Sequence, residues 1–254
     1  MTQPASMFQK IVVFNPKGGS GKSTIATNLA AYYAWRGQRV ALMDLDPQAS
    51  SIRWLKLRPS GAPAIQPIAA CERHTGVTRS FALRVPQGTE KLIVDTPAAV
   101  PALQMPQIVR DASAIVVPVL PSDIDIHAAS RCIADLLLVA KVHRSERRLV
   151  IVANRVRRYP KAHQSLMRFL RSLRIPVAAV LRDSQAYVRS AETGLGLHEM
   201  KGALLQDDLD TWRSLVEWLD RPTFSLVPLE ESPAVPPGPT VQAAERRNAS
   251  TAQA

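Results

Sequence analysis

Residues suited to phosphate chemistry gather first at residues 17–24, whose sequence is K-G-G-S-G-K-S-T. An apolar run precedes this segment, and a helical pattern follows it from Thr24 onward. A strand, a glycine loop and a helix in that order surround an anion with backbone N–H groups and a helix N-terminus. Lys22 is expected to reach the β- and γ-phosphates of a nucleotide, and the Ser23 hydroxyl is expected to bind Mg²⁺. The general form of such loops has glycine where Pro16 stands, so a chance glycine turn is the alternative.

Acidic residues follow two further apolar runs. Asp44 and Asp46 come after one run, and Asp95 ends another. Carboxylates at the carboxyl ends of strands beside a phosphate loop suit a site for a metal ion and a water molecule. Asp95 has the form of a Walker B aspartate, which reaches Mg²⁺ directly or through water. For the acids at 44 and 46, the alternative to a metal and water site is a helix cap after the strand, since Pro47 fits the first position of a helix.

These residues need a frame that brings several strand ends together. Apolar runs predict strands at 11–14, 39–43, 64–69, 91–95, 114–120, 148–153 and 177–181. Helical patterns or caps predict helices at 25–35, 51–57, 76–83, 123–142, 163–173 and 200–219. Alternating strands and helices indicate an α/β fold.

Chain length and composition limit the domain organisation. The chain has 254 residues, of which 46% are apolar, enough for one large core. We expect a single domain at 1–221. Residues 222–254 are rich in Pro, Ala, Glu and Ser without periodicity, which predicts a disordered tail.

Several classes of protein do not fit the composition. No apolar run approaches the roughly 18 residues of a membrane span, and the first ten residues lack the features of a signal peptide. The two cysteines, Cys71 and Cys132, lie far apart without C-x-x-C spacing. They predict reduced thiols in a cytoplasmic protein and argue against an iron–sulfur reductase.

Basic residues are concentrated in one part of the chain. The net charge is +11, and residues 141–189 hold 13 Lys and Arg against two acids, which accounts for the whole excess. Such a tract predicts a surface for a polyanion, and a solvated arginine-rich face is the alternative. Its three aromatic residues, Tyr159, Phe169 and Tyr187, are few. This favours binding to a phosphate backbone over stacking on single-stranded bases.

The first lysine of the phosphate loop makes the motif more specific. K-G-G-x-G-K-[ST]-T is the deviant phosphate loop of the ParA/MinD family of ATPases, and residues 17–24 match it throughout. D-x-D-P-Q at 44–48 and the strand at 91–95 followed by Thr-Pro also resemble this family, although many members have proline where Ala98 stands. The resemblance covers about residues 10–220. It implies a single-domain P-loop NTPase with a mostly parallel central sheet and helices on both faces.

The resemblance also implies roles for individual residues, with ATP and Mg²⁺ as cofactors. Lys17 looks like the signature lysine that crosses to the other subunit's phosphates in an ATP-bound homodimer. Asp46 looks like the residue that orients the attacking water, so the expected catalytic residues are Lys17, Lys22 and Asp46. Asn154 resembles the family's adenine-reading asparagine, with a turn residue as the alternative. Because no N-K-x-D motif is present, ATP is favoured over GTP.

The expected contacts fall into three sets. Nucleotide contacts are expected at Lys17, Gly18, Gly19, Ser20, Gly21, Lys22, Ser23, Thr24, Asn154, Arg182 and Asp183. Metal contacts are expected at Ser23, Asp46 and Asp95, with Asp44 nearby. Contacts to DNA are expected at Arg155, Arg157, Arg158, Lys161, Arg168, Arg171 and Arg189.

The small ParA-type ATPases imply a cycle for this chain. The ATP dimer binds nonspecific double-stranded DNA of the nucleoid, and a cargo-bound adaptor protein stimulates a hydrolysis that is slow on its own. The cargo is a plasmid, a carboxysome or another large complex. Only about ten residues precede the first strand, so we expect no helix-turn-helix module.

Two other classes remain as alternatives. One is a membrane-associated positioning ATPase of the MinD type. The helix predicted at 200–219 carries mainly acidic charges, whereas a membrane-surface helix is basic, so we expect it to pack on the sheet without a membrane partner. The other is a metabolic ligase or reductase, which needs a second substrate pocket or cluster cysteines.

Overall fold

The computed structural model describes residues 8–70, 83–143, 148–157, 160–202 and 205–221, with the side chains of 160–165 excepted. The predicted tail at 222–254, most of the helix predicted at 76–83, and Arg158 lie outside the described residues. The boundary between domain and tail therefore stays a prediction.

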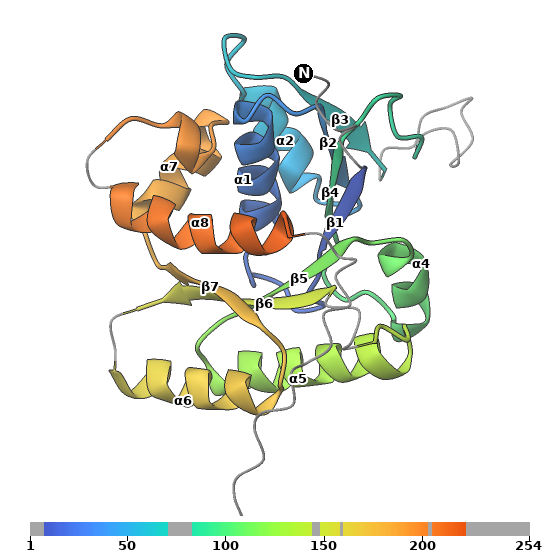
Figure 1. Ribbon diagram of the computed structural model, residues 1–254, viewed down its shortest axis with the longest axis vertical. Helices are drawn as coiled ribbons and strands as arrows, with labels where there is room; N and C mark the ends of the chain where they lie inside the picture. The colour runs from blue at the N-terminus through green and yellow to red at the C-terminus, as the bar shows by residue number, and fades with distance from the viewer. Residues whose placement is uncertain (1–7, 71–82, 144–147, 158–159, 203–204, 222–254) are drawn as a thin grey trace, which may run out of the picture. The chain divides into compact units, whose positions relative to one another are not determined.

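A seven-stranded parallel sheet forms the centre of the fold (Figure 1). Its order is β3-β2-β4-β1-β5-β6-β7, and every adjacent pair is parallel. The strands are β1 (Gln9–Val13), β2 (Val40–Asp44), β3 (Ile65–Ala69), β4 (Lys91–Asp95), β5 (Ala114–Val119), β6 (Leu149–Val156) and β7 (Val177–Arg182). β2, β4 and β5 are buried along their whole length, which is why they read as unbroken apolar runs. The predicted α/β fold is confirmed.

Helices cover both faces of this sheet, as expected. The helices and 3₁₀ turns are α1 (Lys22–Trp35), α2 (Ser50–Leu57), η1 (Ala102–Gln104), α4 (Met105–Val109), α5 (Asp123–Leu138), α6 (Pro160–Ser172), α7 (Gln185–Thr193), η3 (Leu197–Glu199) and α8 (Gln206–Leu219). One core cluster contains side chains from α1, α2, α7 and α8, and the other contains side chains from α4, α5 and α6. Figure 1 shows α5 and α6 together on one side of the sheet and α1 with α8 on the other. Alternate residues of β1 serve the two clusters, so that Ile11 and Val13 face one and Val12 faces the other.

Three helix ends differ from the predictions. α1 begins at Lys22 and not near residue 25, because Gly21 takes a left-handed conformation at φ 93° and leads directly into the helix. α5 ends at Leu138 and not near residue 142, with Lys141 at a positive φ of 53° just beyond it. α8 begins at Gln206 and not at Met200, because Met200 is extended (φ −86°, ψ 148°) and Gly202 has a φ of 154°.

The position of β1 defines the place where a ligand can bind. β1 pairs with β4 on one side and with β5 on the other, so the chain order reverses there. In parallel sheets, ligands bind in the crevice at the carboxyl ends of the strands beside such a reversal. Asp95 is opposite Asp44 in the β2–β4 register and opposite Val13 in the β1–β4 register. The predicted phosphate loop and both predicted acidic strand ends therefore meet at one edge.

Candidate functional site

A cavity of about 610 Å³ opens at this edge of the sheet. The phosphate loop, the loop after β2, the end of β6 and the start of α7 form its walls. Its lining residues are Gly18, Gly19, Gly21, Lys22, Ser23, Thr24, Asp46, Gln48, Ser50, Ala98, Asn154, Arg155, Arg182, Asp183, Ser184, Tyr187, Val188 and Ala191. The structure thus brings most of the predicted nucleotide contacts together around one space. Lys17, Ser20 and Asp95 do not line it, although they contact residues that do.

The phosphate loop requires glycine at position 21 for two reasons. Gly21 has a positive φ of 93°, and a Cβ there would lie 2.1 Å from Nδ2 of Asn154. That amide donates a hydrogen bond of 2.8 Å to the carbonyl of Ser20. The Asn154 side chain is buried and fixes the loop, so the structure gives it a positioning role beside the predicted adenine contact.

Lys22 lies over the phosphate loop. Its side chain is 6% exposed, and Nζ donates a hydrogen bond of 3.2 Å to the carbonyl of Lys17. Burial lowers the pKa of Lys22, while the carboxylates of Asp95 and Asp46 act in the opposite direction. The Lys22 ammonium group therefore lies near Asp95 and Asp46 and bonds to the Lys17 carbonyl. A phosphate group in the cavity could take the place of that carbonyl as its hydrogen-bond acceptor.

Lys17 points to a different part of the molecule. Its Nζ forms an ion pair with the Asp125 carboxylate on α5, and its backbone N–H donates to Oδ1 of Asn15. Asn15 in turn donates to the carbonyl of Pro118 at the end of β5. The side chain of Asp125 also bonds to Ser122, the residue that caps α5. The Lys17 ammonium is thus held by its own chain, at the junction between the phosphate loop and α5.

Two buried carboxylates lie behind the phosphate loop. Asp44 accepts hydrogen bonds from the backbone N–H groups of Asp46, Ser51 and Ile52, so it holds the loop after β2 and the start of α2. Asp44 thus binds backbone N–H groups in the first turn of α2, although the N-cap position is Ala49, and its place near a metal ion stays a prediction. Pro47 does not occupy the first helical position, because α2 begins at Ser50.

Asp95 is the better candidate for a metal ligand. Its Oδ2 accepts a hydrogen bond of 2.6 Å from the Ser51 hydroxyl, whereas its buried Oδ1 has no hydrogen-bond partner among the described residues. Burial raises the pKa of Asp95 to about 6, against the opposing effects of Ser23, Ser51 and Lys22. Burial disfavours the charged form of this carboxylate, and a cation bound at the free Oδ1 would stabilise that form.

The residues present fit Mg²⁺. This ion takes oxygen ligands, keeps several waters, and usually binds one or two protein groups together with the phosphates of a substrate. Ser23 and Asp95 supply a hydroxyl and a carboxylate of that kind. Within the described part of the chain there is no group of three or more His, Cys, Asp or Glu that could hold a metal.

Asp46 lies in a tight turn at the cavity wall. Its Oδ1 accepts a hydrogen bond from the backbone of Gln48, and its carbonyl accepts one from Ala49, which has a positive φ of 49°. Asp46 is half-buried and faces the cavity, as the prediction for a water-orienting residue requires. Its contribution to a metal site stays a prediction.

Two residues expected to contact the nucleotide, Arg182 and Asp183, form ion pairs within the chain. Arg182 lines the cavity but donates to Asp208 and Asp207 of α8, at 3.0 and 3.1 Å. Asp183 accepts from Arg157 at 2.8 Å and lies 4.0 Å from Arg155. Both predicted nucleotide contacts are thus already paired within the chain.

The described arginines of the predicted DNA-binding set lie on both faces of the sheet. Arg168 and Arg171 are exposed on α6, whereas Arg189 is exposed on α7, and these helices pack on opposite faces of the sheet. Arg157 lies at the end of β6, and Arg155 beside it lines the cavity. The side chain of Lys161 lies outside the described residues. The basic tract is continuous in the sequence, but the chain crosses from α6 on one face of the sheet through β7 to α7 on the other. Its arginines therefore lie on two faces.

Sequence reasoning missed several residues of the site. Ser51 bonds to Asp95, and Tyr187 and Val188 line the cavity from α7. The hydroxyl of Tyr187 accepts a hydrogen bond from Trp212 of α8. A hydroxyl residue seven positions after Asp44 could have indicated Ser51. Residues 180–190 resemble the segment of the ParA/MinD family that closes over the base, although Ser184-Gln185-Ala186 departs from the commoner sequence, but that resemblance did not single out Tyr187 or Val188. Among the described residues, no helix is long and apolar enough to cross a membrane.

Comparisons with known protein sequences agree on one group of relatives. A model of the CobQ/CobB/MinD/ParA nucleotide-binding domain matches residues 11–197. A protein named maintenance of carboxysome distribution protein A, from Gloeobacter kilaueensis, is 31% identical over 226 residues. That alignment covers 86% of this chain and 97% of the relative.

Solved structures resemble the fold of this chain. MinD from Aquifex aeolicus has a TM-score of 0.60 at 18% identity and covers 82% of this chain and 97% of its own. An ATP complex of McdA from Cyanothece has a TM-score of 0.61 at 14% identity, covering 83% and 97%. At these identities the likeness establishes the fold alone.

Proposed function

The chain belongs to the CobQ/CobB/MinD/ParA nucleotide-binding family, and from this premise we propose that it is an ATPase acting as a dimerising switch on DNA. In its ATP state it binds DNA without sequence preference and positions a large cargo. Stimulated hydrolysis then separates the dimer and releases it from DNA. A carboxysome or a body of similar size is the proposed cargo, because a 31% identical relative is named for carboxysome distribution.

One observation carries the ATPase part of the proposal. The phosphate loop, Lys22 and Asp46 line a single cavity at the switch point of a parallel sheet, and the buried Asp95 lies behind that loop. In phosphoryl transfer a protein acts mainly by positioning and by charge stabilisation, which these groups can supply. Backbone N–H groups and Lys22 bind the phosphates, and Asp46 holds the attacking water. Ser23 and Asp95 would hold Mg²⁺, which neutralises charge on the β- and γ-phosphates.

The dimer part rests on Lys17 and on exposed apolar side chains. The side chain of Lys17 is one-third exposed, and two large apolar side chains protrude from η1 and from the first turn of α5, the elements that follow β4 and β5. These are Leu103, which is 86% exposed, and Ile124, which is 74% exposed. Apolar side chains so exposed around a charged site suit an interface that forms only in one nucleotide state.

The DNA part rests on charge. Exposed arginines on α6 and at the end of β6 can contact phosphates, and each contact releases counterions. Two copies in a dimer double the number of contacts, so affinity and salt dependence both rise steeply. A cargo-bound adaptor protein that stimulates hydrolysis completes the cycle, and the nucleoid is the proposed location.

Binding to nonspecific duplex DNA tests the proposal. It is measured across a salt series with no nucleotide, with ADP, and with ATP and Mg²⁺. Binding only with ATP, fading steeply with salt, is expected. Binding that ignores the nucleotide would reduce the basic residues to a nonspecific charge effect, and absence of binding in all three states would reject the DNA part.

A membrane-associated switch of the MinD type is the second candidate, and the described residues do not favour it. The apolar side of α8, including Trp212, Leu215 and Leu219, packs into a core cluster as predicted. This leaves α8 no apolar face for a bilayer. Co-sedimentation with anionic liposomes in the presence of ATP would detect such an activity.

A further inference from the structure

A buried polar cluster joins α1, α2 and α7, the three helices that border the nucleotide cavity. We name it the Arg58 cluster, and its members are Asn28, Trp54, Arg58, Ser190 and Glu199. None of the five lines the cavity. Their side chains are nonetheless almost completely removed from solvent: Asn28 is 2%, Trp54 4% and Ser190 1% exposed, and the side chains of Arg58 and Glu199 are 6% and 5% exposed.

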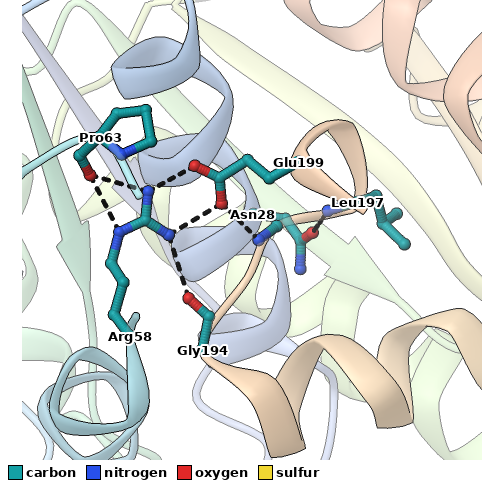
Figure 2. Close-up of polar contacts among 7 residues, drawn as sticks. Asn28, Arg58, Pro63, Gly194, Leu197 and Glu199 are labelled. Atoms are coloured by element: carbon teal, nitrogen blue, oxygen red, sulfur yellow. Dashed lines mark hydrogen bonds and ion pairs between the residues drawn. The ribbon is translucent and has the colours of Figure 1, made fainter. Parts of the chain in front are cut away.

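Arg58, directly after α2, uses its whole guanidinium group in this cluster (Figure 2). Nε and Nη2 donate to the carbonyl of Pro63, Nη1 donates to the carbonyl of Gly194, and both terminal nitrogens donate to the carboxylate of Glu199. Glu199 also accepts a hydrogen bond of 2.8 Å from the backbone of Gly196. The fork of Arg58 therefore ties the end of α2 to the segment that follows α7.

Asn28 and Trp54 connect the same segment to α1 and α2. The amide of Asn28 donates to the carbonyl of Thr24 in its own helix and to the hydroxyl of Ser190 on α7, at 2.9 and 3.3 Å. Its carbonyl oxygen accepts from the backbone of Leu197, as Figure 2 shows. Trp54 donates to the carbonyl of Ser190 at 2.8 Å. Ser190 is thus held from two helices at once.

Two glycines bring the three backbones together. A Cβ on Gly194, which has a φ of 68°, would lie 2.5 Å from the backbone nitrogen of Arg58. A Cβ on Gly196 would lie 2.3 Å from the Cβ of Ala31 on α1. The chain after α7 therefore rests directly on α2 and on α1, with no room for a side chain between them.

Each joined helix borders a different part of the site. α1 carries Lys22 and Ser23 at its start, and α2 follows the Asp46 turn. α7 contributes Tyr187, Val188 and Ala191 to the base side of the cavity. The Arg58 cluster is therefore a physical connection between the wall for the base and the groups for the phosphates.

We propose that the Arg58 cluster positions α7 against α1 and α2, so that a nucleoside triphosphate can contact its base wall and its phosphate loop at the same time. Its members are positioning residues, because none of them reaches the cavity. The inference rests on the proposed binding of ATP but not on dimerisation, DNA or cargo. A buried ion pair adds little net stability over an apolar pair, yet its directional bonds permit one arrangement of the helices. Removing one partner leaves a buried charge unpaired and allows the base wall to shift.

The test compares two ligands that use different parts of the cavity. ATP needs both the phosphate loop and the base wall, whereas inorganic triphosphate needs the phosphate loop alone. In Glu199→Gln we expect the affinity for ATP to fall by about tenfold, within the cost of misplacing a binding group. The affinity for inorganic triphosphate should stay unchanged. Calorimetry measures both, and in the ATPase assay KM for ATP should rise more than kcat falls.

The matched control is Glu192→Gln, the same substitution at an exposed position of α7. It should leave both affinities at their wild-type values. If Glu199→Gln does not fold, Ser190→Ala makes the same comparison, because it removes only the hydroxyl that accepts from Asn28. A parallel loss of both affinities would reduce the cluster to general stability, and an unchanged ATP affinity would likewise overturn the inference. Failure of the wild type to bind ATP would instead reject the proposed function.

Discussion

The ammonium group of Lys17 pairs with the Asp125 carboxylate of its own chain. The resemblance to ParA-type ATPases gives this lysine a partner in the opposite subunit, so the two arrangements exclude each other. Asp125 is nearly buried, and its carboxylate accepts a hydrogen bond from the Ser122 hydroxyl. This bond holds the carboxylate in place to pair with the Lys17 ammonium. In the proposed cycle, the intrachain pair therefore competes with dimerisation.

Asp125→Asn should favour the ATP dimer. Neutralising the carboxylate removes an ion pair of about 1 kcal/mol from each of the two subunits, which corresponds to a dimer about thirtyfold tighter. Analytical ultracentrifugation with ATP measures the shift. Asp123→Asn, two residues away in the same first turn of α5, controls for the interaction with the helix dipole. Equal dimerisation in the two variants would show that the Lys17–Asp125 pair does not compete.

Lys22→Ala and Lys17→Ala should separate nucleotide binding from assembly. Lys22 lies in the cavity wall, so its loss should abolish measurable ATP binding. Lys17 points away toward α5, so Lys17→Ala should bind ATP normally yet remain a monomer. Calorimetry and light scattering give the two readouts. Tight ATP binding by Lys22→Ala would remove that residue from its role.

Asp46→Ala should slow hydrolysis without weakening ATP binding. Asp46 faces the cavity, and loss of a group that orients or activates water costs about a hundredfold or more in rate. The variant should therefore remain as an ATP dimer on DNA, where the wild type is released. Phosphate release and DNA retention are measured together. Turnover at the wild-type rate would exclude Asp46 from the chemical step.

Arg168→Ala combined with Arg171→Ala should weaken DNA binding. The pair lies exposed on α6, and loss of two phosphate contacts should lower the slope of log affinity against log salt by about two per protomer. ATP hydrolysis in the absence of DNA should not change. Arg213→Ala, at an exposed arginine on α8, is the control because it removes one positive charge from another helix and should leave the salt slope unchanged. An unchanged salt slope would move the DNA surface to Arg157 or Arg189.

His198 should make folding stability depend on pH. Burial against Tyr32 and Trp35 lowers the pKa of His198 to about 4, with Glu199 opposing. The unfolded chain takes up this proton near pH 6.5, whereas the folded chain resists it until about pH 4. The stability contributed by neutral His198 is therefore complete above pH 6.5 and falls as the pH drops through this window.

The urea midpoint at pH 7 and pH 5 measures this dependence. His198→Phe keeps the ring contacts and cannot titrate, so it should lose less stability than the wild type between the two values. Asp95 acts in the opposite sense, because its raised pKa makes the folded state less stable as the pH rises through about 6. Only the difference between wild type and variant isolates His198, and identical losses would contradict the assignment.

The fold could be predicted because its local signals agree. Strands buried on both faces read as apolar runs, and the segments between them carry helical patterns. The glycines of the phosphate loop and the acids after β2 and β4 also stand at strand ends, where parallel strands bring them to one edge. These features need no knowledge of distant contacts.

The remaining parts of the site depend on contacts between distant residues. Ser51 meets Asp95 across 44 positions, and Asn154 meets Ser20 across 134. No local pattern reports such pairs. The spatial division of the basic tract depends on the same kind of information, since adjacency along the chain does not report the two faces on which α6 and α7 lie.

The central place of β1 has a consequence during protein synthesis. β1 leaves the ribosome first, but the residues that flank and brace it come much later: Lys91 lies 82 positions beyond Gln9, Pro118 lies 103 beyond Asn15, and Asn154 lies 134 beyond Ser20. A nascent chain therefore carries an unbraced phosphate loop until most of the domain has been translated. For the proposed ATPase, nucleotide binding is then a late event of biogenesis, because the contacts that brace the phosphate loop form last.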